Sequence, residues 1–219
     1  MRTIRAVAWD IDGTLIDSEP LHDAVLVEVC ELHGADLSDL PQNHFRGVHM
    51  PDVWKVLRAR LPEGVEEAAW LNAIVERYVE RASELQPLPG ALEVMQMLSD
   101  AGIRQVCVSN SNRSVVDANL RALAILDRID FSISLDDVVA GKPDPEPYLA
   151  AATRLGLSPD EMAAVEDSVA GATSARAAGM RVFAIAPDGH GHLEPAETTI
   201  HRLLDLPELI LRPLPLGAR

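Results

Sequence analysis

The 219-residue sequence has few cysteines and few lysines, and each shortage excludes a class of protein. Its two cysteines, Cys30 and Cys107, are too few for a disulfide-stabilised scaffold. Both lie in apolar segments, which favours buried, reduced thiols. Lysine occurs only at Lys55 and Lys142, and the 19 basic side chains face 34 acidic ones, for a formal net charge of −15. This excess of acid argues against nucleic-acid binding, which depends largely on basic side chains that neutralise phosphates.

Long hydrophobic runs are also missing. No window of about 18 residues is continuously apolar, so no transmembrane helix and no membrane partner are expected. The first residues, MRTIRAVAWDID, become acidic by position 10 and do not resemble a secretory signal. We therefore expect a cytoplasmic protein. The length fits one large domain with a smaller insertion.

An apolar run over residues 4–9 predicts a buried strand that ends at Asp10. Between residues 20 and 85 the apolar residues recur at helical spacing, with no strand pattern. Helices are expected there over residues 21–34, 51–61 and 66–85. A breaker cluster at 87–90 then separates this stretch from the rest of the chain.

After residue 90 helices and strands alternate. Helices are predicted at 91–102, 112–123, 145–156 and 168–179, strands at 104–109, 161–166 and 181–186, a short strand or loop at 130–137, and a weak helix at 197–206. This alternation predicts an α/β fold, a Rossmann-like parallel sheet with helices on both faces. The α/β core would comprise residues 1–17 and 87–219, and an all-helical domain residues 18–86.

Polar side chains follow the predicted strands, where ligands bind in open parallel sheets. They are Asp10, Asp12, Ser109, Asn110, Ser111, Lys142, Glu166 and Asp167. Carboxylates are the hard oxygen ligands that Mg²⁺ prefers, and a lysine with hydroxyl and amide donors can bind phosphoryl oxygens. A carboxylate can also act as a nucleophile, and a second one can shuttle a proton. The set therefore fits Mg²⁺-assisted phosphoryl transfer.

Each of these residues also has a structural interpretation. Asp10–Gly13 could form a turn or begin a calcium loop, although Thr14 and Leu21 stand where that loop needs ligands. Ser109–Ser111 could cap a helix, Glu166 and Asp167 could favour a helix N-terminus, and Lys142 could lie in a surface turn. Their joint placement at strand ends favours a functional site.

Four segments resemble the motifs of the haloacid dehalogenase-like (HAD) hydrolase superfamily. They are DIDGTLIDS at residues 10–18, Ser109, Gly-Lys-Pro at 141–143, and VEDS at 165–168. The helical insertion resembles the cap of the β-phosphoglucomutase and phosphoglycolate phosphatase branch. The resemblance implies a phosphoric monoester hydrolase with an α/β core and a helical cap.

The resemblance also implies a role for each matching residue. Asp10 would be the nucleophile, and Asp12 the general acid and base. Ser109 and Lys142 would hold the transferring phosphoryl group.

The implied cofactor is Mg²⁺. Its ligands would be Asp10, the backbone carbonyl of Asp12, Glu166 and Asp167. The implied partner is a small phosphorylated metabolite, and a monomer is the expected state.

Substrate-binding residues are expected mainly in the cap. The candidates are Glu19, His22, Arg46 and Gly47, together with Asn110 of the core. Arg46 and His22 could equally be surface residues. In the mutases of this branch an arginine follows the cap glycine, but Met50 stands at the comparable position here.

This departure favours a phosphatase over a mutase. With the resemblance, we expect a phosphatase that acts on a sugar, sugar-acid or polyol phosphate through an aspartyl-phosphate. A hexose-phosphate mutase and a catalytically silent metal-binding module remain the alternatives.

Overall fold

The computed structural model describes residues 3–41, 44–45, 48, 50–186 and 193–211, and the chain divides into two units. One unit comprises Met1–Ile16 and Pro87–Arg219, and the other comprises Asp17–Gln86. A two-stranded sheet of β2 (Ile16–Asp17) and β3 (Gln86–Pro87) forms where the chain leaves and re-enters the first unit.

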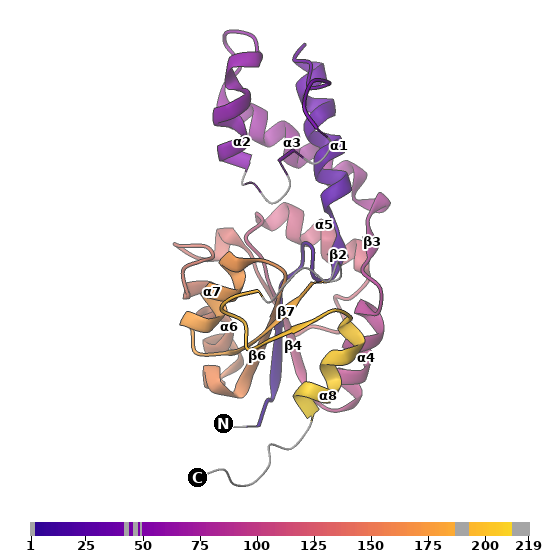
Figure 1. The fold of residues 1–219 in the computed structure, drawn as a ribbon, viewed down its shortest axis with the longest axis vertical. Helices are drawn as coiled ribbons and strands as arrows, with labels where there is room; N and C mark the ends of the chain where they lie inside the picture. The colour runs from indigo at the N-terminus through magenta and orange to yellow at the C-terminus, as the bar shows by residue number, and fades with distance from the viewer. Residues whose placement is uncertain (1–2, 42–43, 46–47, 49, 187–192, 212–219) are drawn as a thin grey trace. The chain divides into compact units, whose positions relative to one another are not determined.

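The first unit is built on a six-stranded sheet in the order β5-β4-β1-β6-β7-β8 (Figure 1). These strands are Ala6–Trp9 (β1), Arg104–Val108 (β4), Ser132–Ile133 (β5), Met162–Glu166 (β6), Arg181–Ile185 (β7) and Thr198–Ile200 (β8). Every pairing is parallel. The predicted α/β class is therefore confirmed, with β1 in the interior of the sheet.

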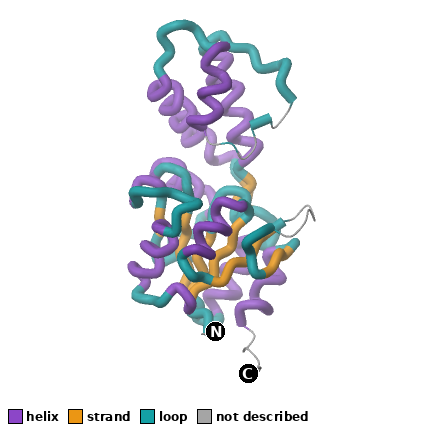
Figure 2. The backbone as a smooth tube through the Cα atoms, turned by 60° about the vertical axis from the view of Figure 1, so that its left-hand side comes forward, coloured by secondary structure: helices purple, strands orange, loops and turns teal. Residues whose placement is uncertain are grey.

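Helices cover both faces of this sheet (Figures 1 and 2). On one face α6 (Glu146–Leu155) and α7 (Val169–Ala177) pack against alternate residues of the strands, among them Ala8, Val106 and Ala164. Across the sheet from them lie α4 (Ala91–Asp100) and α8 (Leu206–Leu211), with α5 (Arg113–Leu123) following β4. Because both faces of the sheet are buried, the strands appear in the amino-acid sequence as continuous apolar runs.

Polar residues fix where the helices start. The Asn112 side chain accepts a hydrogen bond from the N–H of Val115 at the start of α5 (3.0 Å). The Ser168 hydroxyl accepts one from the N–H of Gly171 at the start of α7 (3.1 Å). Each cap satisfies a backbone donor that the helix itself leaves unpaired. These starts agree with the helices predicted from residues 112 and 168.

The second unit contains α1 (Glu19–Leu32), α2 (Met50–Leu57) and α3 (Glu67–Arg81), joined by loops (Figure 2). The rings of Trp54 and Trp70 lie 5.4 Å apart and join α2 to α3. The rings of His22 and Tyr78 stack at 4.4 Å and join α1 to α3. Aromatic contacts thus connect the three helices predicted for this stretch.

The expected helix over residues 197–206 is wrong in its first half. Thr198–Ile200 forms β8 at the edge of the sheet, and helical structure begins only at Leu203. The β-branched side chains of this segment suit an extended backbone, and β7 offers an unpaired edge. Among the described residues, no helix combines the length and apolar character needed to cross a membrane.

Candidate active site

Asp10 occupies the carboxyl end of β1, where its backbone N–H donates to the carbonyl of Val165 on β6 (2.9 Å). The chain then turns sharply, and Gly13 adopts a φ of +78° that side chains rarely allow. A Cβ atom at Gly13 would lie 2.0 Å from Oδ2 of Asp167. This glycine therefore lets the turn approach the Asp167 carboxylate closely.

Lys142 reaches into the same place from the turn after β5. Its Nζ donates to Oδ1 of Asp10 (2.7 Å), Oε1 of Glu166 (2.5 Å) and the carbonyl of Val108 (2.8 Å). The lysine is 6% exposed and Glu166 is fully buried. A buried ammonium ion needs such partners, because desolvation of an unpaired charge costs several kcal/mol.

Glu166 is locked in one orientation. The Tyr148 hydroxyl, on α6, donates to Oε1, and the Ser168 hydroxyl donates to Oε2 (3.3 Å). A Cβ atom on Gly171 would lie 1.9 Å from Oε2, so only glycine leaves room for this carboxylate. Helices α6 and α7 thus both contribute to the placement of Glu166.

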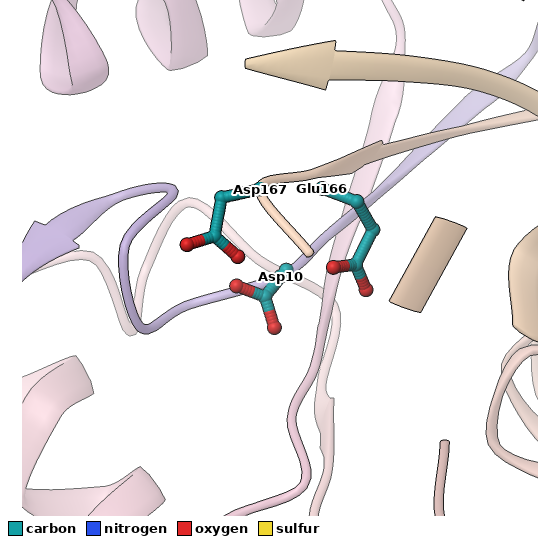
Figure 3. Close-up of side chains that lie close together, drawn as sticks. All are labelled: Asp10, Glu166 and Asp167. Carbon is teal, nitrogen blue, oxygen red and sulfur yellow. The ribbon is translucent and has the colours of Figure 1, made fainter. Parts of the chain in front are cut away.

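The carboxylates of Asp10, Glu166 and Asp167 converge at the ends of β1 and β6 (Figure 3). One oxygen from each lies within 4.8 Å of the others. Oδ2 of Asp10 is buried and has no hydrogen-bond partner among the described residues. Converging hard oxygen donors with one left unpaired fit a divalent cation such as Mg²⁺.

Electrostatics at this cluster also favour a cation. Burial raises the pKa of Asp10 well above its usual range, Lys142 opposes the shift, and the neighbouring carboxylates add to it. Burial, with help from the charge of Glu166, raises the pKa of Asp167 to about 7. Burial alone would lower the pKa of Lys142, but Asp10 and Glu166 outweigh it and raise that pKa. The lysine therefore stays charged, while the acids lack sufficient positive charge.

These shifts predict how stability without divalent metal depends on pH. Because the folded protein holds a proton on Asp167 up to about pH 7 and the unfolded chain loses it near 3.8, the free energy of unfolding should fall as pH rises through this window. The expected fall from this group is roughly 3–4 kcal/mol, at about 1.4 kcal/mol per unit of pKa shift. Urea unfolding in EDTA from pH 4 to 8 measures it.

The matched variant for this measurement is Asp167→Asn. It removes the titrating group, so its stability should fall less over the same range. Equal pH dependence in both proteins would contradict the assignment to Asp167.

Asp12 lies beside the cluster and accepts hydrogen bonds from the turn after β4 and from α5. Its Oδ1 accepts from Nδ2 of Asn119 (2.9 Å). Its Oδ2 accepts from the hydroxyl of Ser111 (3.1 Å) and, at the longer distance of 3.4 Å, from that of Ser109. Ser109 in turn accepts the N–H of Ser111 (3.0 Å). Ser109 is thus close to Asp12, as its position after β4 predicts.

Asn110 bonds to the backbone of Lys142. Its Oδ1 accepts the Lys142 N–H (2.7 Å) and its Nδ2 donates to the Lys142 carbonyl (2.9 Å). A Cβ on Gly141 would lie 2.7 Å from Oδ1 of Asn110, so glycine permits this contact. Asn110 therefore anchors the lysine, and a part in substrate binding stays a prediction.

The structure brings all the predicted core residues together at the carboxyl ends of the strands. Glu19 and His22 lie on α1 of the helical unit, and their part in substrate binding stays a prediction. Arg46 and Gly47 lie outside the described residues.

Three residues of the site were missed in the sequence. They are Asn119, which contacts Asp12, and Tyr148 and Gly171, which both contact Glu166. Each has a signal that could have found it. Asn119 and Tyr148 are hydrogen-bonding residues on the apolar faces of their helices, and Gly171 is a glycine in the first turn of a helix.

Comparison with known proteins agrees with this geometry. Residues 4–179 match the model of the haloacid dehalogenase-like hydrolase family. The chain belongs to this family. The match spans the strands and turns that carry Asp10, Ser109, Lys142 and Asp167, so the predicted family is confirmed.

Similar proteins include phosphatases. Hexitol phosphatase B of Escherichia coli K12 is 32% identical over 84% of each chain. Phosphoglycolate phosphatase of Nitrosospira multiformis is 33% identical over 83% of each chain. The crystal structure of CbbY from Rhodobacter sphaeroides in complex with phosphate has a TM-score of 0.82 and 25% identity, covering 93% of this chain and 96% of that one. The predicted class, a phosphoric monoester hydrolase of the HAD family, is confirmed.

Proposed function

We propose that this HAD-family enzyme is a Mg²⁺-dependent phosphatase that hydrolyses a small sugar, sugar-acid or polyol phosphate through an aspartyl-phosphate on Asp10. One observation carries the proposal. The buried Nζ of Lys142 holds one oxygen of Asp10, while the second oxygen of Asp10 has no partner among the described residues. A carboxylate that is held in place by a hydrogen bond to one oxygen, with no hydrogen bond to the other, can attack phosphorus.

In the first step an oxygen of Asp10 forms a bond to phosphorus as the bond to the leaving alkoxide breaks. Asp12 gives its proton to that alkoxide, which leaves as the alcohol, and Asp12 becomes a carboxylate. Ser109 and Lys142 hold the phosphoryl oxygens, and Lys142 offsets the charge that gathers at Asp10. Placement of these groups before the reaction supplies much of the rate.

In the second step water attacks the phosphorus of the aspartyl-phosphate. Asp12 takes the proton of this water, so its carboxyl group is restored for the next cycle. Inorganic phosphate leaves and Asp10 regains its carboxylate.

The residues that would hold the cation are Asp10, Glu166 and Asp167, with the backbone carbonyl of Asp12. When bound, Mg²⁺ supplies positive charge that neutralises the phosphoryl oxygens. The raised pKa values of Asp10 and Asp167 support this assignment, because burial and mutual repulsion leave their charged forms poorly stabilised.

Similar proteins support the substrate class. The names of two relatives, hexitol phosphatase B and phosphoglycolate phosphatase, point to a polyol phosphate and a phosphorylated hydroxy acid. A CbbY variant of Rhodobacter sphaeroides, with 25% identity and a TM-score of 0.81, was solved with xylulose-(1,5)bisphosphate. We propose that the helical unit Asp17–Gln86 acts as the cap and selects among such compounds through Glu19, His22, Arg46 and Gly47.

The direct test measures phosphate release from a panel of sugar, sugar-acid and polyol phosphates. We expect release with Mg²⁺ and loss of at least about 10²-fold in EDTA, with recovery on adding excess Mg²⁺. Release that persists undiminished after complete metal removal would contradict the metal assignment.

A second outcome separates hydrolysis from isomerisation. If hexose phosphates release no phosphate but interconvert once a sugar bisphosphate is added, the enzyme is a mutase. If no compound turns over in either assay, the silent metal-binding module replaces the proposal.

A further inference from the structure

Asn119 is a polar residue on the apolar face of α5. It is fully buried, and its neighbours on that face include Val115, Val116, Leu120 and Leu123. A buried amide is unfavourable unless it is hydrogen-bonded, so an asparagine at this position needs a partner. Nδ2 of Asn119 donates a hydrogen bond to Oδ1 of Asp12 (2.9 Å).

The two oxygens of Asp12 have different surroundings. Oδ1 faces Nδ2 of Asn119, and an amide NH₂ group can only donate. Oδ2 faces the hydroxyls of Ser111 and Ser109, which can donate or accept. A proton placed on Oδ1 toward Asn119 would meet another donor, whereas a proton on Oδ2 toward the serines meets groups able to accept it.

We propose that Asn119 is a positioning residue that fixes the Asp12 carboxyl group so that Oδ2 is the oxygen that exchanges the proton with substrate and water. The inference rests on the proposed function, because it concerns the proton transfer of that reaction. Oδ2 is also the oxygen nearer Ser109, the residue assigned to the phosphoryl group. The amide thus turns the acidic oxygen toward the reacting atoms without touching them.

The proton step distinguishes positioning from simple structural support. When phosphorus leaves an alkyl oxygen, the alkoxide is a poor leaving group and needs the proton of Asp12. A p-nitrophenolate is a stable leaving group and needs little protonation. A misplaced Asp12 should therefore slow the alkyl substrate selectively, whereas a loosened fold should slow both substrates.

The experiment compares kcat/KM for p-nitrophenyl phosphate with kcat/KM for the best alkyl phosphate of the panel. This parameter covers the steps through alcohol release and excludes the later hydrolysis of the aspartyl-phosphate. The variant Asn119→Leu is close to asparagine in shape but has no donor. We expect it to lose about 10- to 100-fold on the alkyl phosphate and less than about 3-fold on the aryl phosphate. Asn119→Ala is measured alongside, so that a folding defect of the leucine variant does not decide the result.

Gln105→Met is the matched control. Gln105 is another buried amide of the same sheet unit, but it bonds to Trp9, Met95 and Ser99 and not to the site. Its loss should lower stability without changing the ratio of the two substrates. Asp12→Asn should show the same selectivity as Asn119→Leu, only more strongly.

Equal losses on both substrates in the two Asn119 variants would overturn the inference while leaving the phosphatase proposal in place. A wild-type enzyme that releases phosphate from neither substrate would overturn the proposed function first, and the role of Asn119 with it.

Discussion

Asp10→Asn is expected to abolish phosphate release, with a loss of at least about 10⁴-fold, while the fold is retained. The amide is nearly the same shape as the carboxylate and can still accept the hydrogen bond from Lys142. It is a poor nucleophile, so no bond to phosphorus forms. Because burial disfavours the charged form of Asp10, its removal should not lower the melting temperature in EDTA.

Phosphate release and thermal unfolding of the same preparations check this. Asp100→Asn provides the control, because this exposed acid at the end of α4 lies outside the site. The control should keep the rate of the wild type. A variant at Asp10 that retains substantial turnover would contradict the nucleophile assignment.

Among the variants proposed, Lys142→Met should cause the largest decrease in the free energy of unfolding. Removing the ammonium leaves Asp10 and Glu166 without the partner that both share. Loss of one partner from a buried ion pair typically costs about 3–5 kcal/mol, since the remaining charge is uncompensated. Phosphate release should fall by about 10²–10³-fold, as when a donor to the transition-state oxygens is removed.

The destabilisation should be greater at pH 8 than at pH 5. At low pH Asp10 and Asp167, whose pKa values are raised, take up protons, and the repulsion among the carboxylates becomes weaker. Chemical denaturation in EDTA at both pH values measures the difference.

Lys55→Met is the matched control, because Lys55 is the other lysine of the chain and its side chain is 71% exposed. It pairs with Asp52 on the surface, where such pairs contribute little. A similar stability loss in both lysine variants would show that the charge network around Lys142 is not what stabilises the fold.

Much of the catalytic site was predictable because Asp10, Ser109 and Asp167 each directly follow a strand. The apolar runs before Asp10, Ser109 and Asp167 are long enough to be identified as strands, and parallel strands bring their carboxyl ends together. Capping residues such as Asn112 then mark where the following helices begin.

Other features depend on contacts that one sequence does not reveal. Asn119 and Asp12 are separated by 107 positions, and only the packing of α5 beside the first turn brings them together. Thr198–Ile200 forms a strand because it can pair with the open edge of β7. The local spacing of its residues does not show this pairing and suggested a helix instead. Local periodicity records which face of an element is buried, but not what that face meets.

The interior position of β1 also determines when the arrangement of the site is lost during unfolding. Its residues pair with β4 on one side and β6 on the other, in register over Ala6–Trp9. The short strands β5 and β8 at the two edges can fray while this centre stays paired. We therefore expect the part of the sheet that carries the acids to open last, so that their arrangement is lost together with the fold and not before it.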